Sequence, residues 1–304
     1  MNSRLGDLAA AWRRWLFVGC DLRALAIFRI GWAIAMFVSA ADDWGRAPLY
    51  SPERFHVPLT TWAAPVSATE YHTLIRVAAI GCAMTFIGLL PRIGAAAVCV
   101  TNGYLLSTDL LLFRNHIYLG CLLGLLLAAS PSGSSLSVGA LARKVLGRQV
   151  PVVGCGASAQ LIKAQVLLVY FWSVVNKLRP SFLDGWTLQQ EAPHALAESQ
   201  LARWSGAGNG GLLSILVKAI ESDRAMAMCS WAVVLLEAFL FFGLPRRRWS
   251  RYAAVAGVAL HGTIFVLMGV FTFGLLMVSS YPLFLAEPAR VSTNRSTMPP
   301  RRLV

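Results

Sequence analysis

Charged side chains are scarce in this chain, and acidic ones are the scarcest. Of the 304 residues, 13% are charged and 57% are hydrophobic, and 27 Lys and Arg outnumber 14 Asp and Glu. So few polar side chains cannot cover the surface of a soluble globule of this length. The composition therefore excludes an ordinary soluble domain and predicts an integral membrane protein.

Paired cysteines and internal repeats are also lacking. The six cysteines form no CxxC pair and mostly lie in apolar segments, so neither a zinc site nor a disulfide framework is indicated. The histidines have no carboxylate or cysteine neighbour at ligand spacing, and no metal is expected. Because the chain lacks the inverted repeats of many transporters, transport is the least favoured class of function.

Long apolar segments make up most of the chain. A helix needs about 20 such residues to cross about 30 Å of hydrocarbon, and backbone exposed to lipid must form hydrogen bonds within its own helix. Suitable segments lie at 24–40, 74–90, 93–110, 116–130, 158–178, 226–244 and 252–286. Because the last segment is long enough for two short helices, the sequence predicts an all-α, polytopic transmembrane bundle of seven or eight spans.

The positions of the basic residues predict the orientation. With the N-terminus in the cytoplasm, the cytoplasmic connections are basic and the opposite connections are acidic or balanced. The cytoplasmic set is Arg4, Arg13, Arg14, Arg23, Arg92, Arg143, Lys144, Arg148, Arg246, Arg247, Arg248 and Arg251. Topology therefore explains the positive charge better than a polyanionic ligand does, and no nucleic-acid partner is expected. We expect a multi-pass protein of the cell membrane, with the lipid bilayer as its partner.

The chain divides into three regions. Residues 1–23 are predicted to form an amphipathic helix at the interface, with Arg13 and Arg14 toward the headgroups. Its lipid-facing residues would be Leu8, Trp12, Trp15 and Leu16. Residues 24–286 form the membrane domain, which includes an outer loop at 179–225, and residues 287–304 form a basic tail. The outer loop is too short and too rich in glycine to build much of a domain.

Five ionisable residues interrupt the apolar segments: Arg29, His116, Lys177, Glu237 and His261. Such groups cost a few kcal/mol each in a membrane, so they usually face the interior of the bundle. Lys177 and His116 lie at the outer ends of their segments, and His261 lies about 14 Å into its helix. We expect these three to converge on a pocket open to the outer leaflet, and Arg29 and Glu237 to form a structural ion pair.

Lys177, His116 and His261 can each also be interpreted as structural residues. Lys177 could extend to water, since Arg179 follows it closely. His116 could cap its helix at the interface, and His261 could belong to a buried polar network. The functional alternative for Lys177 is that burial favours its neutral, proton-accepting form.

Four stretches resemble a known family. They are Leu25 to Gly31 (LAIFRIG), Asn115 to Leu119 (NHIYL), Val169 to Leu178 (VYFWSVVNKL) with Leu183-Asp184-Gly185, and His261 with Ser279 to Phe284 (SSYPLF). In order and spacing they look like the membrane domain of vitamin K-dependent gamma-glutamyl carboxylases. That domain is shared with bacterial proteins called horizontally transferred transmembrane (HTTM) domain proteins. The chain is similar to a short bacterial member.

The resemblance implies roles for individual residues. In the carboxylases a lysine deprotonates a reduced quinone, oxygen adds to it, and the resulting alkoxide removes a gamma proton from a peptide glutamate so that CO2 can attach. By resemblance, Lys177 stands at the catalytic lysine, His116 at the histidine of the Asn-His-x-Tyr-Leu motif and His261 at a histidine near the quinone pocket. The implied cofactor is reduced vitamin K or another quinone, and the implied cofactor contacts are Asn115, Tyr118, Tyr170 and Asn176.

Two departures from the carboxylases leave an alternative open. Asn176 stands where the carboxylase has a second lysine, so Lys177 would lack a cationic neighbour that favours its neutral form. The large substrate-binding domain of the carboxylases does not follow the last span, so a peptide would be held by the 179–225 loop or by a partner protein. Short relatives include the membrane protein of sporulation-delaying peptide maturation systems.

Two hypotheses follow. The first is a carboxylase-like lyase or ligase that performs base-assisted chemistry on a quinone-like lipid or an exported peptide at the outer face, with Lys177 as base. The second is a non-catalytic partner in the maturation or export of a secreted peptide, acting with a soluble or membrane partner.

Overall fold

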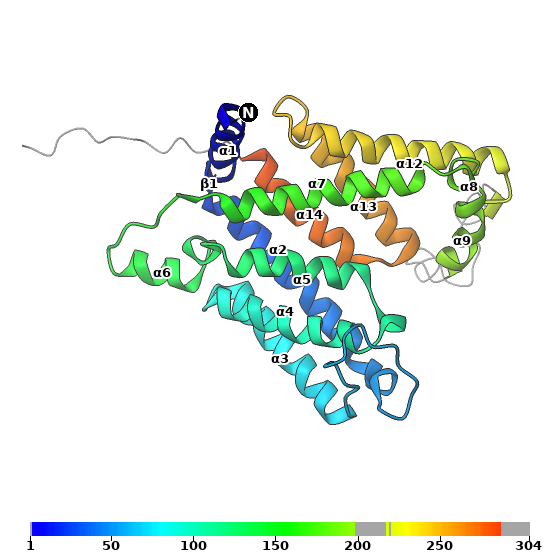
Figure 1. The fold of residues 1–304 in the computed structure, drawn as a ribbon, viewed down its shortest axis with the longest axis horizontal. Coiled ribbons are helices and arrows are strands. Elements are labelled where there is room, and N and C mark those ends of the chain that lie inside the picture. The colour runs from blue at the N-terminus through cyan, green and yellow to red at the C-terminus, as the bar shows by residue number, and fades with distance from the viewer. Residues whose placement is uncertain (1, 198–216, 219, 287–304) are drawn as a thin grey trace, which may run out of the picture.

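Helices form nearly all of the regular structure. A computed structural model describes residues 2–197, 217–218 and 220–286, and Figure 1 shows them as a helical bundle. The longer helices are α1 (Asn2–Leu16), α2 (Leu22–Asp42), α3 (Ala68–Ile87), α4 (Pro91–Thr108), α5 (Asn115–Ala128), α7 (Ala157–Lys177), α9 (Trp186–Ala197), α12 (Asp223–Gly243), α13 (Ser250–Met268) and α14 (Phe271–Leu285). The shorter elements are β1 (Gly19–Asp21), η1 (Asp43–Tyr50), η2 (Leu110–Leu112), η3 (Ser132–Ser134), α6 (Val138–Val145), β2 (Val153–Cys155) and α8 (Pro180–Leu183). The predicted all-α membrane fold is confirmed.

Four of the described helical segments are long and apolar enough to cross a membrane. They are α2 continued by η1, α7, α12 and α13. A fifth results if α5 and the segment after it, which are bent by 62°, count as one span. Each apolar segment of the sequence contains a helix, and the last contains two, α13 and α14. The count of seven or eight spans stays a prediction.

The break in the last apolar segment is at Gly269. This residue follows α13 with a φ of +68°, and its backbone N–H donates to the carbonyl oxygen of Phe265. A left-handed residue after a helix satisfies its final carbonyl groups and turns the chain, and glycine adopts that conformation without a steric penalty. The chain therefore reverses here and begins α14 at Phe271.

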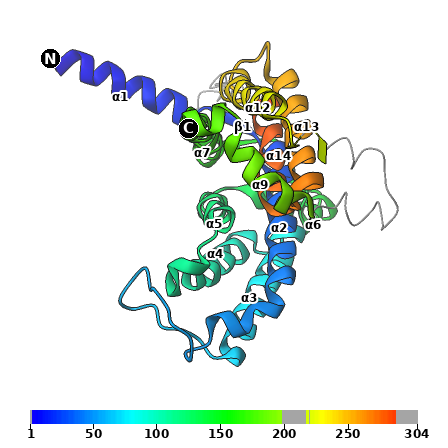
Figure 2. The ribbon, with the colours of Figure 1, turned by 90° about the vertical axis from the view of Figure 1, so that its right-hand side faces the viewer.

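The N-terminal helix stands apart from the bundle. Figure 2 shows α1 projecting away from the other helices, and its Leu8 and Trp12 side chains are exposed. After α1, strand β1 pairs antiparallel with β2, with Cys20 opposite Gly154. This pairing fixes the start of α2 beside the start of α7. The region predicted to be an amphipathic helix thus contains the helix α1. The location of α1 at the membrane interface stays a prediction.

Helix α2 lies at the centre of the core. Its Leu25, Phe28 and Trp32 side chains are fully buried. The indole N–H of Trp32 donates to the carbonyl oxygen of Gly120 in α5 at 2.8 Å. A Cβ atom on Gly124 would lie 2.4 Å from the Trp32 ring, so this glycine lets α5 approach α2 closely.

The predicted ion pair between Arg29 and Glu237 is wrong. Arg29 is fully buried in α2, and its guanidinium donates to the carbonyl oxygens of Ser132 at 2.6 Å, Ser135 at 3.2 Å and Phe86 at 3.4 Å. It therefore satisfies carbonyl groups at the end of α3 and around η3. An arginine with its five donors fits such a set of acceptors without a carboxylate.

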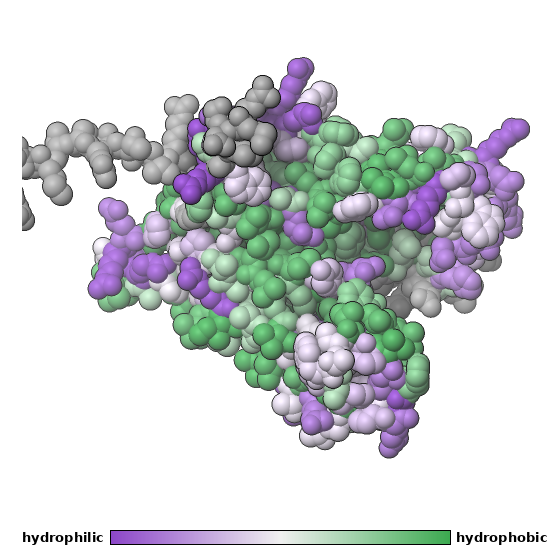
Figure 3. All heavy atoms as spheres, viewed as in Figure 1, coloured by the Kyte–Doolittle hydropathy of each residue, from purple (hydrophilic) through white to green (hydrophobic). Residues whose placement is uncertain are grey.

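Many large apolar side chains are exposed on the surface. Figure 3 shows them across the middle of one face, with polar residues gathered toward its edges. Exposed apolar side chains lie on several helices, including Ile80 on α3, Val100 on α4, Leu235 on α12 and Val255 on α13. A bundle with hydrophobic residues inside and outside matches lipid as its solvent.

The described part of the 179–225 loop packs on the beginning of α12. Gly185, between α8 and α9, has a φ of +89°, and a Cβ atom there would lie 2.5 Å from the backbone nitrogen of Ala227. The Gln189 side-chain amide donates to Asp223 at 3.0 Å. These contacts fix α8 and α9 against α12, which extends beyond the end of α7 (Figure 1). The Gly206–Gly211 stretch and the tail 287–304 lie outside the described residues.

Candidate functional site

Lys177 ends α7 in a compact polar cluster. Its Nζ atom donates to Glu237 Oε1 at 2.6 Å, to Glu237 Oε2 at 2.7 Å and to Ser173 Oγ at 2.6 Å. Ser173 in turn donates to Glu237 Oε1 at 2.9 Å. The Lys177 side chain is 25% exposed and that of Glu237 is 8% exposed. All three N–H groups of the ammonium thus have acceptors within the protein, unlike those of a lysine that only extends into water.

The helices explain why these side chains meet. Ser173 and Lys177 are four residues apart on α7 and therefore lie on the same face, one turn apart. Glu237 is on α12, which runs antiparallel to α7 and continues past its end (Figure 1). A residue well inside α12 is therefore level with the last turn of α7. From the sequence alone, Glu237 is too deep in its segment to meet a residue at an outer end, which is why the pairing with Lys177 was not predicted.

A second polar cluster surrounds His261 in the core. The Tyr170 hydroxyl lies 2.9 Å from His261 Nε2 and 2.6 Å from the Tyr281 hydroxyl, and all three residues are buried. The hydrogen-bond donors can be arranged in two ways. In one, Tyr281 donates to Tyr170 and Tyr170 donates to His261. In the other, His261 donates to Tyr170 and Tyr170 donates to Tyr281. His261 therefore lies in a buried polar network that joins α7, α13 and α14.

His261 also has a buried polar atom without a partner. No hydrogen bond within the described residues reaches its Nδ1 atom. The Phe273 ring lies 5.5 Å from the imidazole ring, nearly perpendicular to it. Since buried polar atoms are usually hydrogen-bonded, an open imidazole nitrogen is a position where a ligand oxygen or a water molecule could bind.

The two clusters share one face of α7. Tyr170, Ser173 and Lys177 are separated by three and four residues, so they follow one another along the helix. Ser173, which donates to Glu237, lies one turn from Tyr170. The structure therefore brings two of the predicted site residues, Lys177 and His261, into neighbouring clusters on this face.

His116 lies elsewhere. It is half-buried in the first turn of α5, and the charged groups that act on it are Arg114, Asp43 and Arg46. Within the described residues, no hydrogen bond or ion pair joins it to Lys177 or His261. Convergence of the three nitrogen groups on one pocket therefore stays a prediction.

The predicted cofactor contacts differ in accessibility. Asn115, Tyr118 and Asn176 are exposed, and Asn176 accepts a hydrogen bond from Arg179 at 3.5 Å. Tyr170 is buried and already hydrogen-bonded on both sides. The first three can therefore meet a molecule at the surface, whereas Tyr170 acts through its two neighbours.

Ser173, Glu237 and Tyr281 complete the two clusters and were not predicted as site residues. The four-residue spacing of Ser173 and Lys177 was a usable signal. Tyr281 lies in the SSYPLF stretch, but its distance of 20 positions from His261 says nothing about contact without the turn at Gly269. Among the described residues there is no group of three or more His, Cys, Asp or Glu side chains able to hold a metal ion.

Comparison with known proteins adds a family assignment. The family model described as HTTM domain matches residues 17–288, which includes both clusters. No curated protein matches the chain, and no solved structure matches it.

Proposed function

We propose that this chain, which belongs to the HTTM domain family, is a membrane enzyme. It would perform base-assisted chemistry on a quinone-like lipid or an exported peptide. The observation that supports this most is the cluster of Lys177, Glu237 and Ser173. An amine in direct contact with a carboxylate and a hydroxyl has a route by which to lose and regain a proton.

The base function requires one internal proton transfer. A proton moves from Lys177 Nζ to a Glu237 carboxylate oxygen, which leaves a neutral amine beside a neutral carboxylic acid. The Glu237 side chain is only 8% exposed, and burial lowers the advantage of the charged pair over the neutral pair. Ser173 bonds to both groups and keeps them aligned. The neutral amine can then accept a proton from a substrate. The Glu237 carboxylic acid gives up its proton to the product or to water as the product leaves, and this restores the ion pair.

The buried histidine network would serve the same reaction. When all donors along Tyr281, Tyr170 and His261 reverse, each proton shifts along its hydrogen bond and no heavy atom moves. Such a network can stabilise negative charge that develops on a substrate oxygen near His261. We assign this supporting role to His261 and leave the base to Lys177.

A reduced quinone is the cofactor that the family resemblance implies, and we propose that it binds near His261. The open Nδ1 atom of His261 is a buried nitrogen that a quinone oxygen could meet, and Asn115, Tyr118 and Asn176 would be its further contacts by family resemblance. A reduced quinone, when bound, would supply an acidic hydroxyl and the electrons for reaction with oxygen. His116 would bind or orient the substrate from α5.

The alternative is a non-catalytic partner in the maturation or export of a secreted peptide. One observation favours it: the ion pair between Lys177 and Glu237 joins α7 to α12 and can simply hold the two helices together. In that case, function requires a positively charged side chain of similar length at position 177, but not one that can accept a proton.

Turnover of a reduced quinone separates the two functions. The full chain in lipid nanodiscs is given reduced vitamin K or reduced menaquinone with oxygen, and loss of the quinol and formation of oxidised products are followed by chromatography. We expect turnover by the unchanged protein and a loss of at least about 100-fold in Lys177→Arg, the scale of a missing general base. Lys163→Arg, on the same helix, is the matched control. Turnover by Lys177→Arg at the unchanged rate would support the helix-holding role.

The proposed orientation has its own test. Phe55 and Val145 are highly exposed in connections on opposite ends of the bundle, and cysteines placed there can be labelled in intact cells with an impermeant reagent. We expect labelling at position 55 and none at position 145, as for a site that faces outward. The reverse pattern would place the Lys177 end in the cytoplasm.

A further inference from the structure

A second polar site lies at the other end of α7. Lys163 is fourteen residues before Lys177, about 21 Å along the helix, so this site is separate from the clusters described above. Two adjoining cavities meet at Gln160, Lys163 and Ala286. The smaller has a volume of about 20 Å³ and the larger about 370 Å³. We call the two together the Lys163 pocket.

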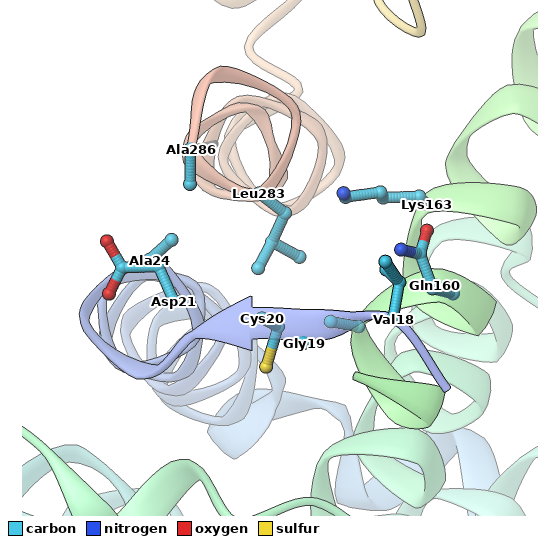
Figure 4. Close-up of a pocket in the computed structure, with 10 residues that line it drawn as sticks. Val18, Gly19, Cys20, Asp21, Ala24, Gln160, Lys163, Leu283 and Ala286 are labelled. Carbon is cyan, nitrogen blue, oxygen red and sulfur yellow. The ribbon is translucent and has the colours of Figure 1, made fainter. Parts of the chain in front are cut away.

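The smaller cavity is closed by three elements. Figure 4 shows Lys163 and Gln160 on α7 facing Leu283 of α14, with the strand that contains Cys20 crossing below them. Asp21 lies on the other side of this cavity (Figure 4), and its carboxylate accepts a hydrogen bond from the backbone nitrogen of Arg23 at 2.7 Å. That carboxylate caps α2 and is not an ion-pair partner of Lys163.

The charge in the pocket is positive. Lys163 is half-buried and forms no ion pair with a carboxylate in the part of the chain that the structure describes. Its Nζ atom lies over the Phe284 ring, 5.8 Å from the centre. Arg247, from the turn between α12 and α13, lines the larger cavity. Because Lys163 has no carboxylate partner there and Arg247 adds a second positive charge at the same cavity, a ligand with a negative charge is favoured.

The remaining walls are apolar. The larger cavity is lined by Leu167, Leu244, Phe284 and Leu285, and by Trp15 of α1. A free inorganic anion would gain nothing from these side chains, because apolar groups stabilise only apolar parts of a ligand. An amphiphile satisfies both halves of the lining, with its anionic group at the basic side chains and its hydrocarbon along the apolar wall.

We propose that the Lys163 pocket binds one acidic phospholipid, with the headgroup phosphate between Lys163 and Arg247 and an acyl chain against Leu167 and Phe284. Gln160, which lines both cavities, adds an amide donor for the headgroup. Trp15 covers the glycerol region, as tryptophan does at membrane interfaces. The bound lipid connects α1 to α7 and α14, and so fixes the N-terminal helix at the membrane surface.

Lipid retention by the full chain tests the proposal. The protein is reconstituted in nanodiscs of phosphatidylcholine with a small fraction of phosphatidylglycerol, released gently, and examined by native mass spectrometry. We expect one retained phosphatidylglycerol, preferred over phosphatidylcholine by about tenfold or more. Lys163→Gln with Arg247→Gln should abolish the preference, whereas Lys163→Arg should keep it.

A matched pair of charges controls for general attraction to the membrane. Arg248 and Arg251 line a separate cavity beside Trp249 and Tyr252, so Arg248→Gln with Arg251→Gln removes the same charge outside the Lys163 pocket. We expect this variant to keep the preference. Equal loss in both double variants, or no preference in the unchanged protein, would overturn the proposal.

Two further readouts complete the test. Excess inorganic phosphate should not displace the lipid; displacement would make the pocket a site for free anions instead. If the double variant fails to fold, Lys163→Gln and Lys163→Arg are compared, and loss of the preference in both would overturn the role of charge. Because the pocket is distant from Lys177, quinol turnover is not needed to judge any of these outcomes.

Discussion

Lys177 and Glu237 form an ion pair between α7 and α12 in which Nζ lies 2.6 and 2.7 Å from the two carboxylate oxygens. Ser173 bonds to both partners. The carboxylate is almost entirely shielded from solvent, while a quarter of the lysine side chain remains exposed. The pair is therefore open on the lysine side, where a substrate could approach, and closed on the side of the carboxylate.

Removing the carboxylate should destabilise the protein. Glu237→Gln leaves the Lys177 ammonium without its counter-charge, and we expect the free energy of unfolding to fall by about 3 kcal/mol, as for buried pairs that lose one partner. Lys177→Met combined with Glu237→Gln should be less destabilised than the sum of the single variants, because no unpaired charge remains. Unfolding of the purified protein in mild detergent measures both. Simple additivity would show that the two residues do not interact.

The network at His261 can be tested from a neighbouring glycine. A Cβ atom at Gly257 would lie 2.2 Å from the Tyr281 hydroxyl, so Gly257→Ala must displace that ring from Tyr170. We expect a loss of about 2 kcal/mol, typical of overpacking. Gly262→Ala on the same helix has no atom within 4 Å of the new Cβ and is the control. Thermal unfolding of the two variants should differ clearly, and similar stability would contradict the packing described here.

Sequence predicted the helices much better than their contacts. Each apolar segment became a helix because the length and hydropathy of a membrane segment determine its state almost alone. The partner of Lys177 was missed because the level of Glu237 depends on how far α12 extends past α7, which α8 and α9 determine by packing on it. Arg29 was paired with the wrong group because backbone carbonyls, which have no sequence signature, can satisfy an arginine.

A second ion pair, with a clear expected effect, joins the end of α2 to the start of α5. The Arg114 guanidinium donates to both carboxylate oxygens of Asp43 at 2.6 Å, and Arg46 lies 3.1 Å from the same carboxylate. Asp43 is buried, so Asp43→Asn should lower the free energy of unfolding by about 3 kcal/mol. Its neighbour Asp42 is exposed, and Asp42→Asn should change stability by less than about 0.5 kcal/mol. Equal effects of the two variants would exclude a structural role for the pair.

The start of α3 should respond to acid. Ser67 donates from its hydroxyl and its backbone N–H to the Glu70 carboxylate, at 2.7 and 2.8 Å, and these bonds hold the pKa of Glu70 below its usual value of 4.5. A lowered pKa in the folded state means that the stabilisation is complete above pH 4.5 and disappears as the pH falls through the folded value. Hydrogen exchange of the first turn of α3 should therefore accelerate below that pH.

Glu70→Gln provides the control for this acid response. Glutamine cannot ionise, and the Glu70 backbone N–H, which donates to Ser67 Oγ at 3.3 Å, remains. Exchange in this variant should be independent of pH after correction for the intrinsic chemical rate. An unchanged acid response would mean that another group titrates there.

The most direct test of Lys177 as base is exchange of the two partners, Lys177→Glu with Glu237→Lys. The exchanged pair keeps the charges and the contact between α7 and α12 but places the amine on α12, at the buried position of Glu237. If Lys177 is the base, the exchanged protein unfolds at nearly the same temperature as the unchanged one but loses reduced-quinone turnover by at least about 100-fold. Turnover at the unchanged rate would contradict the account, because it would show that only the ion pair is required.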